Sequence, residues 1–235
     1  PTRGGGLPDL PTSGEDSLQP RAERQAMDRE SPVADLQWRA VGPQKQGGRI
    51  ESIAVPVGNT STFYEWAGSG NLWKTENNGI TWKPVFDNEG SFAIGVIELD
   101  PNNPNIVWVG SGENNAQRSV GYGDGVYKSV DGGKSWKNMG LKDSGHISMI
   151  RFHPEDSNTI YVAAQGPLWN PGGDRGLYRS TDGGANWERI LDIDENTGIN
   201  EFVINPANPD EIVASSYQRR RHVWTLINGG PGSAV

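Results

Sequence analysis

From Trp38 onward, short runs of mostly apolar residues alternate with clusters of Gly, Pro, Asn and Asp. Short runs bounded by turn residues predict β-strands, and no long stretch shows the 3.6-residue period of a helix. The runs come in groups of four, of which the second reads AIGVIEL, IVWVGSG, GVYKSV and SWKNMG. We therefore predict an all-β fold over residues 38–235.

The groups of runs repeat at a nearly fixed distance. The strings TENNGITW, SVDGGKSW and STDGGANW end at Trp82, Trp136 and Trp187, which are 54 and 51 residues apart. A second marker, present as DPNNPN, HPEDSN and NPANPD, joins the first run of a unit to its second. Four short antiparallel strands in a unit of about 50 residues are typical of a β-propeller blade. We predict a β-propeller of four-stranded antiparallel blades, with three complete blades and a truncated fourth.

The last unit and the segment WRAVG (38–42) leave two arrangements open. INEFVIN and EIVASSY supply two strands of the fourth unit, GPGSAV begins a third, and the Asp-Gly turn and its Trp are missing. Either WRAVG closes a small four-bladed ring in which HVWTLI supplies the third strand, or the chain is an arc of a larger propeller. We favour the arc. It should expose apolar side chains at both ends and associate with further blades, or with a partner chain that completes the ring.

Residues 1–37 have a different composition, with few residues that could form a core. We predict that they are an N-terminal tail or linker, largely irregular. Within them, RAERQAMDRE (21–30) is the stretch most compatible with a short helix against a partner.

Composition narrows the classes of function. The chain has 32 Gly, 16 Pro and a formal net charge of −8. This acidic balance argues against a nucleic-acid partner, which usually needs a basic surface. The sequence has no Cys, so disulfides and thiolate chemistry are excluded. No apolar run approaches the ~20 residues of a membrane-spanning helix, and we expect no membrane span.

The repeated string lies between the third and fourth runs of each unit, so it should form the hairpin that joins them. Its Gly residues allow positive φ, and its Asp or Asn side chain can accept hydrogen bonds from the turn. Its Trp opens the fourth strand and should pack against the neighbouring blade. We interpret all of these residues as structural: Asn77, Asp131 and Asp182 in the turns, and Trp82, Trp136 and Trp187 after them.

The pattern S-x-D-x-G-x-x-W resembles the Asp-box of the BNR-repeat β-propellers. That group includes sialidases, xyloglucan-cleaving endoglucanases, sortilin-like domains and a photosystem II assembly factor. Longer stretches, among them WRAVGPQKQGGRIESIAV and YQRRRHVWTLINGGP, are similar to the N-terminal part of large secreted bacterial sortilin-like proteins that are often called glycosyl hydrolases. The resemblance covers about residues 38–235 and implies a secreted or periplasmic location.

In the Asp-box group, the Asp-box hairpins lie on one face of the disc and ligands bind at the other. That other face carries the loops from second to third strands, which are long here: 112–125, 165–176 and 217–233. Long loops on a rigid scaffold are common binding sites, and Arg, amide and aromatic side chains suit a carboxylate, a sugar or a peptide terminus. The ligand-binding candidates are Asn114, Asn115, Arg118, Trp169, Arg175, Arg219, Arg220 and Arg221. The alternative is that such residues brace their own loops.

Three functions follow, in order of preference. The first is a non-catalytic propeller that binds a protein, peptide or glycan through the long loops. The second is a glycoside hydrolase, which needs two carboxylates flanking the scissile bond. The segment EWAGSGNLW lacks the Asp that the xyloglucanase resemblance implies, and GGRIES keeps only Arg49 of the sialidase pattern, so Glu113 and Tyr217 are catalytic candidates by location alone. The third is a structural subunit of a larger assembly outside the cytoplasm.

We expect no cofactor and no metal, with one weak exception. DIDENTG (192–198) spaces Asp192, Asp194 and Asn196 as in a calcium loop, but it lacks the Gly and Glu that such loops carry at their sixth and twelfth positions. A solvated loop between blades is the simpler interpretation. The three His are scattered along the chain and indicate no metal cluster.

Overall fold

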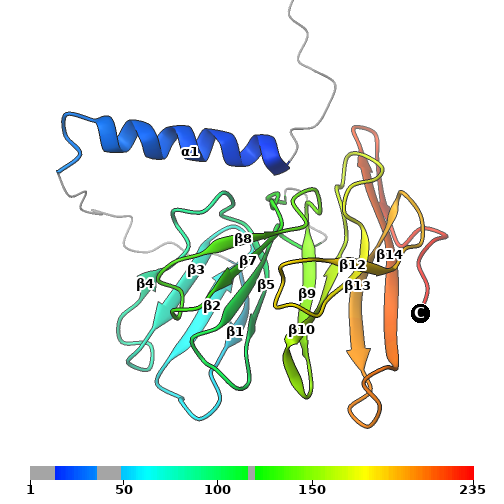
Figure 1. Ribbon diagram of the computed structural model, residues 1–235. Coiled ribbons are helices and arrows are strands. Elements are labelled where there is room, and N and C mark those ends of the chain that lie inside the picture. The colour runs from blue at the N-terminus through cyan, green and yellow to red at the C-terminus, as the bar shows by residue number, and fades with distance from the viewer. Residues whose placement is uncertain (1–13, 36–48, 116–119) are drawn as a thin grey trace, which may run out of the picture.

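The computed structural model describes residues 14–35, 49–115 and 120–235, which form one helix and four antiparallel sheets (Figure 1). The segment WRAVG (38–42) and the ligand-binding candidate Arg118 lie outside the described residues. The predictions that concern them are therefore untested.

Each sheet is built from strands that are consecutive in the sequence and hydrogen-bonded in sequence order. The first sheet contains β1 (Ile50–Ala54), β2 (Phe63–Ala67), β3 (Asn71–Thr75) and β4 (Lys83–Pro84). The second contains β5 (Ile94–Leu99), β6 (Val107–Ser111), β7 (Val126–Ser129) and β8 (Lys137–Gly140). The third contains β9 (Ile147–His153), β10 (Asp156–Ala164), β11 (Gly176–Ser180) and β12 (Glu188–Leu191). These three sheets confirm the predicted four-stranded units and their register on the repeated Trp.

The fourth sheet has three strands: β13 (Thr197–Ile204), β14 (Ile212–His222) and β15 (Thr225–Asn228). The first part of β14 pairs with β13, whereas Arg219–His222 pair with β15. The third strand therefore comes from HVWTLI, and not from GPGSAV as the alignment of the repeats suggested. The reason is that β14 continues beyond its pairing with β13 and turns back at Val223 and Trp224, while Ala234 forms only an isolated bridge to Ser216.

The sheets are stacked side by side as blades around a common axis, with the first strands innermost. β1 contacts β5, β5 contacts β9, and β9 contacts β13. The apolar cores lie between successive sheets. Alternate side chains of each strand point to opposite faces of its sheet, and so toward the two neighbouring sheets. On β6, Val107 and Val109 pack toward the first sheet and Trp108 packs toward the third, all three fully buried. Burying each such side chain stabilises the fold by about 1.5–3 kcal/mol.

The first and fourth sheets carry exposed apolar side chains on their strands. Ile50 and Ile53 on β1 are 56% and 53% exposed, and Val203 on β13 and Val213 on β14 are 69% and 62% exposed. Equivalent side chains in the inner sheets are buried against a neighbouring sheet.

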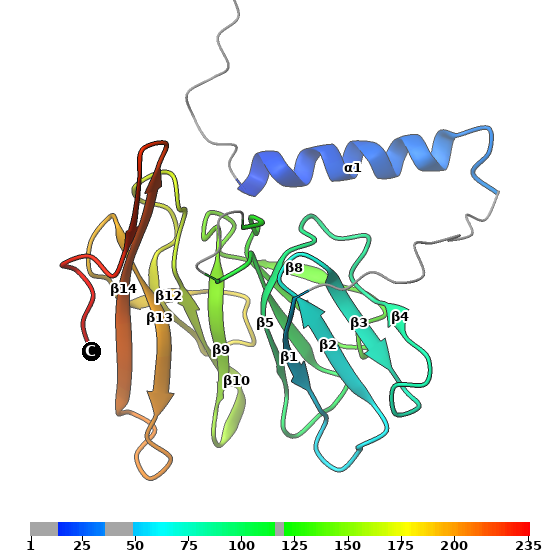
Figure 2. The same cartoon turned by 180° about the vertical axis from the view of Figure 1, so that it is seen from behind.

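The helix α1 (Gly14–Glu30) replaces much of the tail that we expected to be largely irregular. Its polar composition offers no apolar stripe, so its position depends on specific contacts rather than on hydrophobic burial. Arg21 donates to the carbonyl of Asn88 at 2.5 Å and pairs with Glu89 at 2.8 Å. Figures 1 and 2 show α1 crossing one end of the sheets. No helix in the described part of the chain is long and apolar enough to span a membrane.

Candidate functional site

The Asp-box turns and the long loops lie at opposite ends of the sheets. The turn of the second sheet bonds to the loop between β5 and β6, from Gly132 N to Asn105 O, and that of the third sheet bonds to the beginning of β10, from Gly183 N to Asn158 O, both at 2.9 Å. The long loops bond instead to the connections between sheets, as Gly123 N does to Gly145 O at 2.7 Å. In Figure 1 the loops between first and second strands lie at the lower end, and α1 crosses the upper end. We call this upper end, which carries the long loops, the loop face.

Both oxygens of the Asp-box carboxylate in the second sheet accept hydrogen bonds from residues of the same turn. Asp131 Oδ1 accepts from Ser129 Oγ at 2.8 Å and from the backbone N–H groups of Lys134 and Ser135 at 2.9 Å. Its Oδ2 accepts from Ser135 Oγ at 2.6 Å. These hydrogen bonds, those from Ser135 first, lower the pKa of Asp131 to about 2. Such an ionised acceptor holds a turn and has no proton to give in catalysis.

The same geometry recurs in the other two turns. Asp182 accepts from Ser180 Oγ and from the side chain and backbone of Asn186, which lower its pKa to about 2. In the first sheet Asn77 takes the role, accepting from the backbone N–H of Thr81 at 2.9 Å. The repeated string is therefore a local structural device at all three positions.

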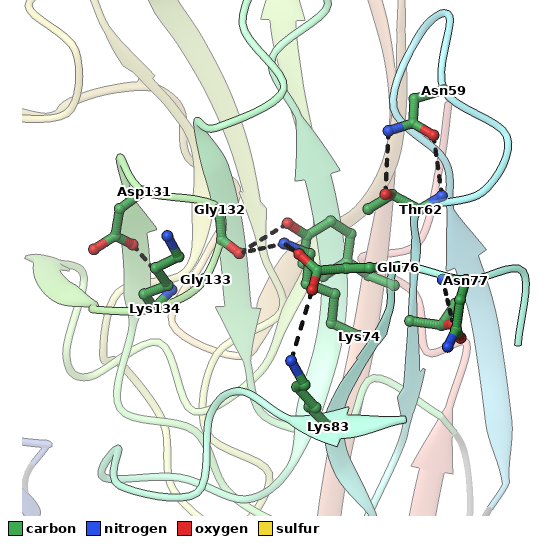
Figure 3. Close-up of polar contacts among 12 residues, drawn as sticks. Asn59, Thr62, Lys74, Glu76, Asn77, Lys83, Asp131, Gly132, Gly133 and Lys134 are labelled. Atoms are coloured by element: carbon green, nitrogen blue, oxygen red, sulfur yellow. Dashed lines mark hydrogen bonds and ion pairs between the residues drawn. The ribbon is translucent and has the colours of Figure 1, made fainter. Parts of the chain in front are cut away.

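The turns also connect neighbouring sheets. Trp136 Nε1 donates to Val85 O at 2.7 Å and Trp187 Nε1 donates to Met139 O at 2.8 Å, each reaching the preceding sheet. In return, the carbonyl of Gly132 accepts from Lys74 of the preceding sheet at 3.1 Å (Figure 3). Trp82 of the first sheet packs edge-on against Phe63 of its own sheet, with ring centroids 5.3 Å apart.

Two of the predicted ligand-binding arginines are buried beneath the loop face. Arg175 donates to the carbonyls of Gln165, Pro167 and Asn170. Arg219 donates to the carbonyls of Asn114 and Asn115 and to Gln165 Oε1. Each residue is only 1% exposed. Burial, the largest cause, lowers the pKa of each to about 10, so both remain protonated at neutral pH.

The next two arginines continue the same arrangement. Arg220 donates to the carbonyls of Leu168 and Trp169 and to Asn196 Oδ1. The backbone N–H of the buried Arg221 donates to Leu168 O at 2.8 Å. The described partners of Arg175, Arg219 and Arg220 are all uncharged oxygens, and most belong to the long loops. These arginines therefore hold the loops in place from below, as the alternative interpretation proposed for Arg175.

His146 lies within this cluster, although no motif in the sequence singles it out. It is fully buried, its ring is 5.3 Å from that of Tyr122, and neither ring nitrogen has a hydrogen-bond partner among the described residues. Burial first, and then Arg219, Arg175 and Arg221, lower its pKa to about 3. His146 is therefore neutral at physiological pH.

The inner edge of the loop face carries two carboxylates. Glu113 is 1% exposed, forms an ion pair with Arg49 and accepts from Gly121 N at 3.3 Å. Glu51 accepts from the amide of Asn115 and lies 3.6 Å from Arg49 Nε. Both carboxylates lie about 3 Å from the place where a Cβ on Gly68 would be, so no more than about 6 Å separates them. The other catalytic candidate, Tyr217, is on β14 and donates to Asn228 at 2.6 Å; no described contact joins it to Glu113.

A cleft of about 480 Å³ runs along the inner strands β1, β5 and β9. Its polar lining includes Glu51, Glu98, Asn114, Ser148 and Arg151, and the largely buried Trp66 also borders it. Glu98 pairs with Arg151 at 2.8 Å, yet burial raises the pKa of Glu98 to about 7. The sequence does carry a signal for Glu98, which is the one charged residue in the apolar first-strand run AIGVIEL, whereas the run RIESIAV that holds Glu51 is less distinctive.

The residues of DIDENTG have other partners. Asp194 accepts from Asn196 N and Thr197 Oγ1, Asn196 accepts from Arg220, and Asp192 lies 3.6 Å from Arg189. Within the described ranges no three His, Cys, Asp or Glu residues are grouped as metal ligands would be.

Comparison with known proteins decides the fold. A model of the BNR/Asp-box repeat matches residues 178–189. The crystal structure of an ancestral GH74 enzyme matches 84% of this chain and 25% of its own, with a TM-score of 0.60 at 19% identity. The fold is a BNR-type β-propeller. The GH74 xyloglucanase from Xanthomonas campestris supports the same propeller, with a TM-score of 0.54 over 77% of this chain and 28% of its own, at 18% identity.

Two curated relatives of this propeller have names that refer to xyloglucan. A probable oligoxyloglucan-reducing end-specific xyloglucanase from Neosartorya fischeri is 35% identical over 114 residues, which are 42% of this chain and 12% of the relative. A xyloglucanase from a Paenibacillus species is 23% identical over 193 residues, which are 76% of this chain and 18% of the relative. The chain thus spans less than a fifth of the length of either protein.

Proposed function

We propose that this propeller binds a glycan where its inner cleft meets the loop face. The observation that carries the proposal is the polar lining of the cleft, in which Glu51 and Asn114 lie toward the loop face and Glu98 lies farther along β5. Carboxylate groups can accept, and amide groups can both accept and donate, the many hydrogen bonds that sugar hydroxyls require. The names of the curated relatives support a sugar over the peptide and protein alternatives.

The described part of the loop at the mouth of the cleft is suited to binding because a buried side chain holds it in place. Arg219 joins the loop that carries Asn114 and Asn115 to β14 through two backbone carbonyls. Fixing a binding surface in advance reduces the entropy lost when the ligand binds. Under this proposal the buried arginines support the site and do not touch the glycan.

The proposal is tested by titrating the protein with a xyloglucan oligosaccharide in a calorimeter. Glu51→Gln should weaken binding about tenfold, since a hydrogen bond to a charged group is worth about 1.5–3 kcal/mol. Val130→Ala is the matched control, because Val130 is 66% exposed on an Asp-box turn at the opposite end. Binding of a peptide carboxylate with no binding of the oligosaccharide would overturn the glycan proposal in favour of a peptide ligand.

Glycoside hydrolysis is a second candidate, favoured by the raised pKa of Glu98. A general acid needs a raised pKa and a second, ionised carboxylate near the same bond. Glu98 has a pKa of about 7, and Glu51 lines the same cleft. Release of reducing ends from xyloglucan, lost in Glu98→Gln, would establish this activity. We expect none from this chain, because EWAGSGNLW lacks the Asp that the xyloglucanase resemblance implies.

Location and assembly complete the proposal. A polysaccharide ligand fits a secreted or periplasmic protein, as the resemblance to sortilin-like proteins also implies. We further propose that additional blades or a partner chain cover the exposed apolar side chains of the first and fourth sheets, among them Ile53 and Val213. A structural role in such an assembly would then accompany glycan binding.

A further inference from the structure

Four large aromatic side chains are exposed on the loop face, one from each of four successive connections. Phe92 follows the first sheet, Tyr122 and Trp169 lie in the long loops of the second and third sheets, and Trp224 lies at the turn between β14 and β15. Their exposed fractions are 61%, 50%, 44% and 82%. Single exposed apolar residues are common on proteins, but a group of exposed aromatics on one face marks an interaction site.

The first three aromatics lie next to one another. Ser91 Oγ donates to Tyr122 O at 2.8 Å, and the Phe92 ring is 3.8 Å from the place where a Cβ on Gly121 would be. Burial raises the pKa of the Tyr122 hydroxyl, and a hydrogen bond with Trp169 opposes that rise, which places Trp169 beside Tyr122.

The fourth aromatic is joined to the third through β14. The carbonyls of Leu168 and Trp169 accept from Arg220, and that of Leu168 also accepts from the backbone N–H of Arg221, so the Trp169 loop is fixed to this strand. β14 leads directly to Trp224, whose ring stacks on His222 with centroids 5.3 Å apart and an interplanar angle of 10°. Figures 1 and 2 show the end of β14 rising on the same side of the molecule as α1.

We propose that Phe92, Tyr122, Trp169 and Trp224 form a row of stacking positions across the loop face on which an extended neutral glycan lies, with its pyranose rings packed against the side chains. The proposal rests on the glycan-binding function proposed above and adds the part of the ligand that lies outside the cleft. The flat face of an aromatic side chain packs against the apolar C–H face of a pyranose ring. A row that crosses four connections requires a chain of several sugars and gives little to a monosaccharide.

The glycan is expected to be neutral because of what lies around the row. The protein carries a formal net charge of −8, which repels a polyanion. Three buried arginines beneath the row, Arg175, Arg219 and Arg220, already donate to loop carbonyls. They are therefore not arranged to bind carboxylates of a uronic acid.

The test compares xyloglucan oligosaccharides of increasing length by calorimetry. For the wild type, affinity should rise with length. Trp169→Ala and Trp224→Ala should each weaken binding of the longest oligosaccharide about tenfold and flatten the rise with length, while Trp169→Phe should retain most of the affinity. Ile80→Ala is the matched control, since Ile80 is 81% exposed on the Asp-box turn of the first sheet. Trp224 is 82% exposed, so its variant should fold like the wild type, as thermal unfolding would verify.

The outcomes separate this proposal from the one on which it rests. If oligosaccharides bind and Glu51→Gln weakens them, but Trp169→Ala and Trp224→Ala bind within twofold of wild type, the row of stacking positions is wrong and the cleft proposal stands. If the wild type binds no oligosaccharide of any length, both proposals fail. If glucuronate-containing oligosaccharides bind more tightly than neutral ones, the ligand is acidic and the argument from the buried arginines is wrong.

Discussion

The hydrogen bonds of the Asp-box turns join residues close in the sequence, whereas those of the loop face join residues far apart in it. The bonds of Asp131 reach residues two to four positions away in the sequence, and the same set is repeated at Asp182. On the loop face, Arg219 bonds to Asn114 across 105 residues and to Gln165 across 54. The first arrangement is encoded by a short string and can recur, whereas the second exists only once the sheets have assembled. The repeat therefore specifies the scaffold, and the single long-range contacts specify the site.

The largest expected effect comes from removing one of those long-range contacts. Arg219→Ala removes the buried donor that two loop carbonyls and Gln165 Oε1 share, which should lower the free energy of unfolding by about 3 kcal/mol. Arg219→Lys should recover only part of this, because an ammonium cannot reproduce the fork of the guanidinium. Urea unfolding measures both variants.

Arg24→Ala provides the control for this prediction, since Arg24 is exposed on α1. It should change the free energy of unfolding by less than about 0.5 kcal/mol. If Arg219→Ala were equally mild, the loop face would not depend on its buried arginines, and the contrast with the Asp-box turns would disappear.

A smaller effect is expected at the Asp-box turn. Asp131→Ala removes an acceptor from two backbone N–H groups near the surface and should cost about 1–2 kcal/mol. Asp131→Asn should cost much less, because the chain itself uses Asn77 at the same position with the same bond to the backbone. Thermal unfolding measures stability, and glycan affinity at the loop face should stay within a few-fold in both variants. Loss of affinity without a change in melting temperature would mean that the two ends are coupled.

The difference between the Asp-box turns and the loop face explains which features could be predicted from the sequence. The spacing of Trp82, Trp136 and Trp187 was enough to place three blades, because each repeat carries its own turn chemistry. The role of Arg175 could not be decided from the sequence, since no local pattern distinguishes an arginine that braces a loop from one that binds a ligand. His146 was missed for the same reason: its burial depends on loops that are distant in sequence.

Two further differences have the same origin. The helix α1 has a polar sequence without an apolar stripe, so its position depends on Arg21 meeting Asn88 and Glu89 far along the chain. The strand β15 departs from the repeat because β14 extends further and the chain then turns back, so that β15 pairs with the end of β14. Both elements are specified by contacts that a search for periodicity does not detect.

The smallest effect concerns the cleft between the two ends and appears as a dependence on pH. The pKa of Glu98 is raised to about 7 by burial, so the folded state holds a proton that the unfolded state releases near pH 4.5. The free energy of unfolding should therefore fall as pH rises from about 4.5 to 7 and then level off, because within that window the native carboxyl binds more protons than the unfolded one. With 24% of the side chain exposed to water, the total should be about 1 kcal/mol.

Glu98→Gln should remove this slope, whereas Glu155→Gln, at an exposed position between β9 and β10, should keep it. Urea unfolding of the three proteins at pH 5 and pH 8 measures the difference. If the wild type shows no more loss between these values than Glu98→Gln, the carboxyl is already ionised in the folded protein at pH 5. Glu98 would then be unable to donate a proton near neutral pH, and hydrolysis in this cleft would lose the observation that favours it, while glycan binding, which needs only acceptors there, would be unaffected.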